Sequence, residues 1–357
     1  MILKVRLIYV FALLIYIYNS SVGTFAQSGK LFDSEEILEL TISGDINRLI
    51  KDRKGEPEYD EMTVTYTASN QEKVSIPLRV RTRGNFRRQQ NICTYPPILL
   101  NFSKKNVDNT VFEGQDKLKL VMPCKGDKYV VREYYAYKIN NILTPKSFKV
   151  RLVKLNLEDS SNKVKTKEPF YAFLIEDEDH MANRNGLEPI GQDLIRPKQI
   201  EAQEFIKMAL FQYFIANTDW SIQFRQNIKI LQNPATKEMI AVPYDFDFSG
   251  LVLTTYSKPA DELEMSSVRE RRYRGYCITN MEHFQKAFVP FIEQKDKIYQ
   301  LYQSSPYLES SYVKSTLRYL DEFYQVINNP KLAERELQYP CLADGTGDVV
   351  IKGLNKN

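Results

Sequence analysis

The middle of the chain carries the residues best suited to chemistry, and their order is more informative than any one of them. Asp219 lies in Asn217-Thr218-Asp219-Trp220, Asn227 follows it, and Asp245 and Asp247 come after a predicted short hairpin. A loop Asp, a downstream Asn and a later acidic pair are the parts with which kinase-like folds transfer phosphoryl groups. In such a site Asp219 would orient or deprotonate a nucleophile, while Asn227, Asp245 and Asp247 would hold a divalent metal against phosphate oxygens.

An earlier segment offers partners for the phosphates themselves. Lys119 lies in an alternating strand and Glu133 in the helix predicted to follow it, the spacing of the Lys–Glu ion pair that positions a kinase Lys on nucleotide phosphates. Lys117 shares the strand face of Lys119, so either lysine could serve. The turn at Arg83 and Gly84 could bring backbone N–H groups toward phosphate. The structural alternatives are a solvated lysine, an ordinary helix glutamate and a plain hairpin turn.

The amino-acid composition limits the types of catalytic chemistry that the chain could perform. The 357 residues are 43% hydrophobic and 26% charged, which suits one large or two small globular domains. A formal charge of +4 gives no general argument for binding nucleic acid or a membrane surface. With only two histidines, His180 and His283, a Ser-His or Cys-His nucleophile and a zinc site are both poorly supported. Carboxylate and metal chemistry remains.

Two arginine runs require an interpretation. The first contains Arg79, Arg81, Arg83, Arg87 and Arg88, and the second Arg269, Arg271, Arg272 and Arg274. Arginine presents a planar fork that suits phosphate oxygens, so phosphate contact and ordinary surface ion pairs are both open for the first run. For the second run, a solvated surface or ion pairs with the abundant Asp and Glu is the favoured interpretation.

The N-terminus predicts export. Lys4 and Arg6 precede an apolar run, and small and polar residues then lead to Ala26, so residues 1–26 are predicted to be a signal peptide. The mature protein would be periplasmic or extracellular without a membrane span, an uncleaved anchor being the alternative. The four cysteines of an exported chain favour two disulfides, Cys93–Cys124 and Cys277–Cys341, over free thiols.

Hydrophobic periodicity predicts a strand-rich first half and a mostly helical second half. The predicted first-half strands are 37–42, 62–68, 74–82, 98–102, 117–121, 148–157 and 169–176, with helices at 45–52 and 130–143. The second half has predicted helices at 198–216, 281–302 and 309–327 and strands at 228–231 and 239–242. This order predicts a two-lobed α+β fold: a strand-rich N-lobe (27–180), a mostly helical C-lobe (181–345) and a flexible tail (346–357).

The chain resembles the CotH family of secreted, atypical kinase-like proteins over about residues 79–250. The resemblance is carried by Arg81-Thr82-Arg83-Gly84-Asn85, Glu133-Tyr134-Tyr135-Ala136-Tyr137, Asn217-Thr218-Asp219-Trp220 with Asn227, and Pro243-Tyr244-Asp245-Phe246-Asp247. It implies a two-lobed protein-kinase-like fold, ATP and Mg²⁺ or Mn²⁺ binding, and phosphorylation of protein side chains. Asp219 would be the catalytic-loop Asp, with Asn227 and Asp245 as metal ligands. The chain departs from ordinary kinases in its longer Asp219-to-Asn227 interval. Its strand 97–102 also carries no lysine, which leaves Lys119 or Lys117 for the phosphates.

The functional prediction is therefore a secreted phosphotransferase that uses a nucleoside triphosphate and a divalent metal, with a protein hydroxyl as acceptor. One alternative is a metal-dependent glycosyl or nucleotidyl transferase that uses Asp245-Phe246-Asp247, which requires a parallel sheet with alternating helices before that motif. The other is a non-catalytic structural or binding protein on a kinase-like scaffold, in which Asp219 or Asp245 could be replaced without loss of function.

Overall fold

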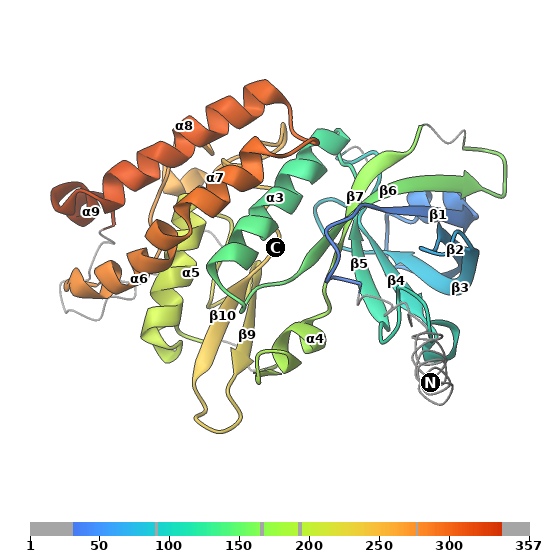
Figure 1. Ribbon diagram of the computed structural model, residues 1–357, viewed down its shortest axis with the longest axis horizontal. Helices are drawn as coiled ribbons and strands as arrows, with labels where there is room; N and C mark the ends of the chain where they lie inside the picture. Colours follow the sequence, from blue (N-terminus) through green and yellow to red (C-terminus); the bar gives the residue numbers. More distant parts are fainter. Residues whose placement is uncertain (1–30, 90–91, 165–167, 192–194, 276–277, 338–357) are drawn as a thin grey trace, which may run out of the picture.

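The computed structural model describes residues 31–89, 92–164, 168–191, 195–275 and 278–337. Within these ranges the fold is mixed α+β, with a β-barrel on one side and a mostly helical half beside it (Figure 1). The predicted signal peptide, the tail and both members of the predicted Cys277–Cys341 pair lie outside the described residues. None of the helices within them is both long and apolar enough to cross a membrane.

Seven strands form the closed barrel, in the order β1-β2-β3-β4-β5-β7-β6. The strands are β1 (Leu38–Gly44), β2 (Asp60–Thr67), β3 (Lys73–Thr82), β4 (Ile98–Phe102), β5 (Lys117–Val121), β6 (Val150–Asp159) and β7 (Phe170–Ile175). Neighbouring strands are antiparallel except β1 and β6, which pair in parallel from Leu38↔Val153 to Gly44↔Asp159. The strand positions confirm the alternation seen in the sequence, but the parallel pairing that closes the barrel was not predicted.

The alternation of β5 (Lys117–Val121) explains how a charged side chain comes to lie between the two halves. Leu118 and Leu120 point into the barrel and belong to its core, whereas Val121 belongs to the core shared with the helices. Because successive strand residues face opposite sides, Lys119 shares the outward side with Val121. The barrel wall therefore presents Lys119 toward the helical half.

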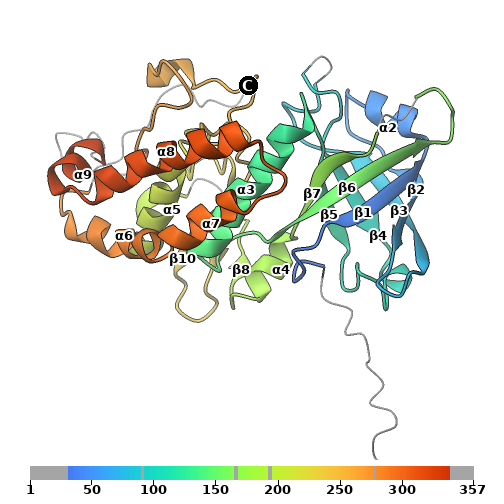
Figure 2. The same cartoon turned by 45° about the horizontal axis from the view of Figure 1, so that its top comes forward.

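A central helix joins the two halves. α3 (Asp127–Leu143) packs against β6 and β7 and against α7 (Lys295–Gln303), so it contacts the barrel on one side and helices on the other (Figure 2). Residues on most of its faces are buried, including the polar Glu133 and Asn140. A helix covered all round carries apolar residues without a single stripe, and buried polar groups on it require partners.

The second half consists of a three-stranded sheet and five further helices besides α7 among the described residues. These elements are α4 (Glu178–Asn183), β8 (Glu188–Pro189), α5 (Ala202–Phe214), β9 (Ile228–Gln232), β10 (Met239–Pro243), α6 (Glu282–Glu293), α8 (Ser310–Ile327) and α9 (Pro330–Glu336), and the sheet order is β10-β9-β8. The predicted helix 281–302 is two helices, because the chain leaves helical geometry at Gln294, and α9 was not predicted. A short helix, α2 (Ile46–Lys51), follows β1 as predicted.

The predicted disulfide Cys93–Cys124 is confirmed. It ties the segment after β3 to the segment after β5, and Thr94 N–H adds a backbone hydrogen bond of 2.9 Å to the carbonyl of Cys124. The disulfide therefore fixes the turn after β3 to the end of the strand that carries Lys119.

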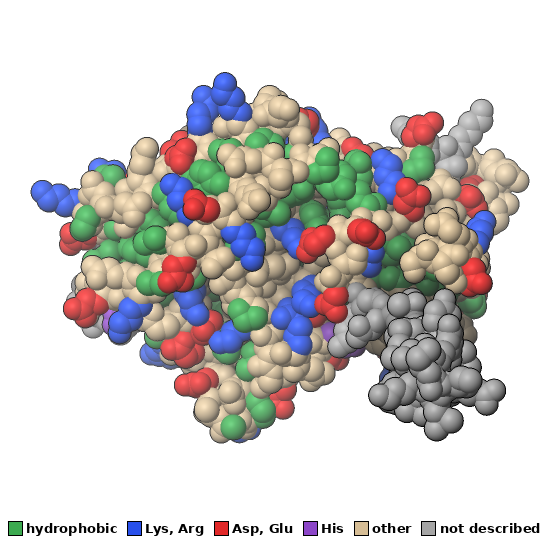
Figure 3. Space-filling model, viewed as in Figure 1, with side chains coloured by type: hydrophobic (Ala, Val, Ile, Leu, Met, Phe, Trp, Pro, Cys, Tyr) green, Lys and Arg blue, Asp and Glu red, His purple; other side chains and the backbone are tan. Residues whose placement is uncertain are grey.

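On the face shown in Figure 3, basic and acidic side chains are interspersed rather than gathered into a field of one sign.

Candidate functional site

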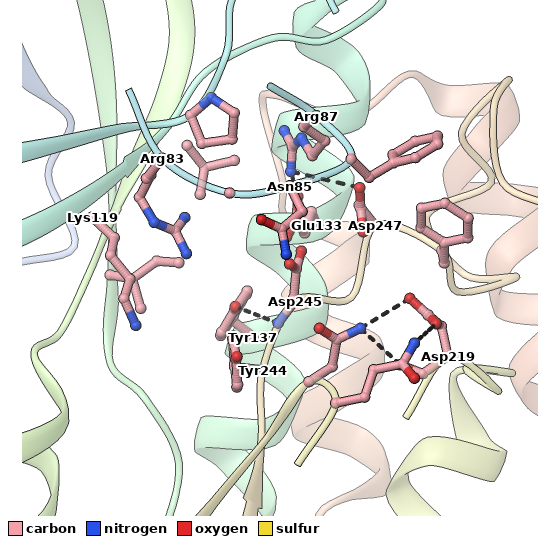
Figure 4. Close-up of a pocket in the computed structure, with 18 of the residues that line it drawn as sticks. Arg83, Asn85, Arg87, Lys119, Glu133, Tyr137, Asp219, Tyr244, Asp245 and Asp247 are labelled. Carbon is pink, nitrogen blue, oxygen red and sulfur yellow. Dashed lines mark hydrogen bonds and ion pairs between the residues drawn. The ribbon is translucent and has the colours of Figure 1, made fainter. Parts of the chain in front are cut away.

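All predicted site residues except Lys117 meet in one cavity of about 590 Å³ that is lined by both halves of the chain. The turn after β3, strand β5, helix α3, the loop between α5 and β9, and the turn after β10 all contribute to it (Figure 4). Its lining includes Arg83, Gly84, Lys119, Glu133, Asp219, Asn227, Asp245 and Asp247. Lys117 is exposed and does not line the cavity, although it shares a strand face with Lys119.

Lys119 forms the basic side of the cavity together with Arg83. Its ammonium nitrogen lies 5.8 Å from the ring centroid of Phe148 and 5.3 Å from that of Tyr244. It makes no ion pair with any described residue. Burial, and then the positive charges of Arg83 and Lys229, lower the pKa of Lys119 to about 8. An anionic ligand in the cavity would therefore stabilise the charged form of Lys119.

The predicted ion pair between Lys119 and Glu133 is wrong. Glu133 pairs with Arg87 instead, at 3.3 Å between Oε2 and Nη1, and the same nitrogen lies 3.7 Å from Oδ2 of Asp247. Arg87 also donates to the carbonyl of Met122 at 3.1 Å. The turn after β3 places Arg87 directly over the helix face that carries Glu133, whereas Lys119 lies farther along the barrel wall (Figure 4).

Burial and their mutual charges shift the pKa values of Glu133 and Arg87. Burial raises the pKa of Glu133 to about 7, against the lowering influence of Arg87. Burial alone would lower the pKa of Arg87, but Tyr256, Glu133 and Asp247 outweigh it, so that the pKa is raised and the guanidinium stays charged. The sequence placed Arg87 in a run of arginines, but nothing local identified its partners.

The turn after β10 brings both acidic residues of the Asp245-Phe246-Asp247 motif to the cavity. Asp245 has a left-handed backbone, with φ of 63°, and its N–H donates to the hydroxyl of Tyr137 at 2.8 Å. The ring of Phe246 lies 4.5 Å from that of Tyr137, centroid to centroid, and anchors the turn in the core. Asp247 is buried and accepts a 2.8 Å hydrogen bond from the hydroxyl of Tyr256. Burial, and then the charge of Asp245, raise the pKa of Asp247 well above its usual range.

Asp219 is held by the amides that surround it. Its backbone N–H donates to Oδ1 of the buried Asn217 at 3.1 Å, an Asx turn that fixes the loop after α5. Nδ2 of Asn227 donates to Oδ2 of Asp219 at 2.9 Å and to its carbonyl at 2.8 Å, and Nε2 of Gln226 donates to Oδ1. Burial, and then the charge of Asp245, raise the pKa of Asp219 to about 6. Trp220 is buried beside Asp219 and packs against Phe205.

The oxygens around the cavity fit a divalent ion that shares its coordination with a ligand. The described residues contain no group of three Asp, Glu, His or Cys side chains spaced to hold a metal ion. Mg²⁺, however, is commonly bound through one or two carboxylates together with substrate phosphates. Oε1 of Glu133 is buried without a hydrogen bond of normal geometry, although the N–H of Phe246 is close enough to lower its pKa. An orphaned carboxylate oxygen beside Asp245 and Asp247 suits a hard cation.

Comparisons with known proteins give only a distant likeness. No family model matches the chain, and no curated protein sequence matches it. Among solved structures, the Helicobacter pylori proinflammatory kinase CtkA is 16% identical with a TM-score of 0.41, over 68% of this chain and 93% of that chain. The Golgi casein kinase is 8% identical with a TM-score of 0.34, over 86% and 77%. The same kinase with Mn/ADP bound gives 9% and 0.33, over 82% and 77%. TM-scores below 0.5 do not establish a shared fold.

Proposed function

We propose that this protein is an exported phosphotransferase with a kinase-like arrangement of two lobes, the barrel and the helical half, and with the cavity between them as its active site. The observation that carries the proposal is the joint placement of Lys119, the Asp245–Asp247 turn and Asp219 around one cavity. ATP with Mg²⁺ or Mn²⁺ is the donor that the family resemblance implies, and a protein hydroxyl is the acceptor. We also propose that the chain is related to the CotH family.

Each group has a role that its surroundings support. Lys119 and Arg83 would bind the phosphates, since both line the cavity and Lys119 makes no ion pair within the part of the chain that the structure describes. A divalent ion held by Asp245 and Asp247, with Oδ1 of Asn227, would offset the negative charge of the phosphate oxygens. Nδ2 of Asn227 is already used on Asp219, which leaves Oδ1 for this purpose.

Asp219 would position the acceptor hydroxyl. As the hydroxyl oxygen bonds to the terminal phosphorus and the bond to the bridging oxygen breaks, a carboxylate oxygen of Asp219 takes the proton, and ADP leaves. The amides of Gln226 and Asn227 fix the orientation of that carboxylate before the acceptor arrives. Such prior placement is the main contribution a protein makes to this reaction.

A non-catalytic scaffold is the second candidate, and one observation favours it. Arg87 already neutralises Glu133 and lies near Asp247, so a fixed cation stands next to the place of the metal. The transferase alternative is disfavoured, because the strands before Asp245 form a largely antiparallel barrel and a hairpin rather than a parallel sheet with alternating helices.

The test is ligand binding followed by transfer. The melting temperature of the oxidised protein is measured with ATP, GTP or UDP-sugars, each with and without Mg²⁺ or Mn²⁺. A ligand at a hundredfold excess over its Kd adds about 2.7 kcal/mol, a readily measured shift. We expect a metal-dependent shift with ATP that disappears in Asp245→Asn. A shift with UDP-sugars alone would favour the transferase instead.

Transfer of labelled terminal phosphate to exported proteins then separates the enzyme from the scaffold. We expect Asp219→Asn to keep the ATP shift and to reduce transfer by about 10²- to 10⁴-fold, the usual contribution of a positioned acid–base group. ATP binding without any transfer by the wild type would support the scaffold. If no nucleotide or metal shifts the melting temperature, both the phosphotransferase and the glycosyl or nucleotidyl transferase are excluded.

A further inference from the structure

The second arginine run has partners that its sequence did not reveal. Arg272 is exposed and donates to the carbonyl of Leu263 at 2.9 Å and to Glu270 at 3.0 Å, as a surface residue would. Arg271 and Arg274 are only partly exposed, and both donate to backbone carbonyls of the chain around Asp219. Arg271 also pairs with Glu322 at 3.0 Å, as the ion-pair interpretation expected, but the contacts of both residues with backbone carbonyls were not predicted.

The arginines belong to a segment, residues 250–275, that donates hydrogen bonds to the backbone carbonyls at the end of α5, just before Asp219. The last carbonyls of a helix have no partner within the helix. After α5, the N–H of Leu251 donates to the carbonyl of Ile215 at 3.0 Å and that of Gly250 to Ala216 at 2.9 Å. Nε of Arg271 donates to the carbonyl of Phe214 at 3.3 Å. Segment 250–275 thus supplies the hydrogen-bond donors that water would otherwise provide at the end of α5.

Arg274 continues this pattern into the Asp219 loop. One nitrogen, Nη1, donates to the carbonyls of Thr218 and Trp220, the latter at 3.2 Å, and these residues flank Asp219 on both sides. The guanidinium carbon lies 5.9 Å from the ring centroid of Trp220, and its positive charge acts on Asp219. The amides of Gln226 and Asn227 hold the Asp219 side chain, so backbone and carboxylate are fixed by different elements.

The placement of Arg274 depends on how segment 250–275 closes on itself. A Cβ atom added to Gly250 would lie 2.3 Å from the carbonyl oxygen of Val268 and 2.9 Å from Cα of Arg269. Real Cβ atoms do not come so close to backbone, so only glycine allows the two ends of the 250–269 loop to touch. Arg271 and Arg274, which follow this contact, are thereby directed back toward the end of α5 and the Asp219 loop.

We propose that Arg274 is a positioning residue that holds the Asp219 loop from segment 250–275 and thereby sets the rate of transfer without contributing to nucleotide binding. The inference rests on the proposed function, and it concerns only the Asp219 side of the site. Arg274 is not among the residues that line the cavity, whereas Lys119, Arg83 and Asp245 are. Its loss displaces Asp219 and leaves those three residues in place.

The expected signature is a loss of turnover at unchanged affinity. Displacement of a catalytic group by about 1 Å costs on the order of 10²-fold in rate. For Arg274→Met we expect turnover to fall by about 10- to 100-fold, with the Kd for ATP and metal within about twofold of the wild type. Arg274→Lys keeps the charge and a donor, and we expect it to recover part of the turnover.

Trp220 supplies a readout that does not depend on activity. It is the single tryptophan of the chain and lies buried in the same loop. In Arg274→Met we expect a red shift of its emission and stronger quenching by acrylamide, because the loop loses the contact that covers the ring. Arg272→Met, in the same run but without contact with the loop, serves as the matched control and is expected to change neither emission nor turnover.

The outcomes separate the inference from the proposed function. Wild-type emission and turnover in Arg274→Met would overturn the inference, and so would equal losses in Arg272→Met, which would indicate general destabilisation. If Arg274→Met does not fold, Arg274→Lys is compared with Arg272→Met by the same criteria. If the wild type binds no nucleotide, the proposed function fails, and the Trp220 emission alone decides whether Arg274 holds the loop.

Discussion

Lys119 makes a testable connection between the stability of the protein and its proposed function. A lysine that is kept in a partly buried cavity, with no ion pair to any residue that the structure describes, raises the free energy of the folded state, since its charged form loses hydration. Lys119→Met keeps most of the aliphatic chain that packs near Phe148 and Tyr244 and removes the charge. We therefore expect the variant to be more stable than the wild type and to lose nucleotide binding.

The magnitude follows from the shift in pKa. Lowering the pKa from 10.5 to about 8 corresponds to a ceiling of about 3.4 kcal/mol at 1.36 kcal/mol per unit. Lost cation–π contact, worth roughly 0.5–1 kcal/mol, and screening by water in the cavity reduce this ceiling, so we expect a gain of about 1–2 kcal/mol. The folded pKa lies below the unfolded one. The full gain is therefore present below pH 8 and disappears as the pH rises toward 10.5, where the unfolded lysine also loses its proton.

The assay is urea unfolding of wild type and variant at pH 7 and pH 10, compared at equal m-values. Lys117→Met is the control, because Lys117 lies exposed on the same strand face outside the cavity, and we expect it to change stability by less than about 0.5 kcal/mol. A Lys119→Met protein that is less stable than the wild type at pH 7, or equally stabilised at both pH values, would refute the reasoning.

Three further changes test the groups around the cavity. Arg87→Met leaves Glu133 and Asp247 without their cation, and we expect a loss of about 3–5 kcal/mol in urea unfolding, partly recovered by adding Glu133→Gln. Tyr137→Phe removes the acceptor for the N–H of Asp245, which should cost about 1–3 kcal/mol and weaken metal-dependent ATP binding; unchanged binding would speak against this role. Replacing both Cys93 and Cys124 by serine should cost about 2–5 kcal/mol, and stability equal to the wild type would contradict a structural disulfide.

The parts of the site that local patterns encode could be predicted from the sequence. Alternating residues gave the strand that carries Lys119, and turn residues gave the hairpin β9–β10 between Asp219 and Asp245. Because a hairpin returns the chain to its starting edge, both ends of that hairpin were expected at one place, and both line the cavity. The disulfide Cys93–Cys124 was predicted from the expectation of export and from the spacing of the cysteines, and it is confirmed.

The parts that depend on distant contacts could not be predicted. The barrel closes through parallel pairing of β1 with β6, more than a hundred residues apart, and neither strand encodes the other in its pattern. The partner of Glu133 was misassigned because the reach of Arg87 depends on where the turn after β3 lies relative to α3. The contacts of Arg271 and Arg274 with the chain before and after Asp219 could not be predicted, because their acceptors there are backbone carbonyls, which no side-chain pattern displays.

The charges of the cavity indicate why nucleotide and metal should bind together. Among the described residues, its lining has three basic and four acidic side chains: Arg83, Arg87 and Lys119 against Glu133, Asp219, Asp245 and Asp247. A nucleoside triphosphate alone would add several negative charges to a site already rich in carboxylates, and like charges at short range oppose binding. A divalent ion offsets both sets of negative charges, so each ligand should increase the affinity for the other by the same factor. Titrations of ATP at several Mg²⁺ concentrations, and of Mg²⁺ at several ATP concentrations, should give equal coupling. Tight metal-free ATP binding would mean that Lys119 and Arg83 hold the phosphates away from the carboxylates.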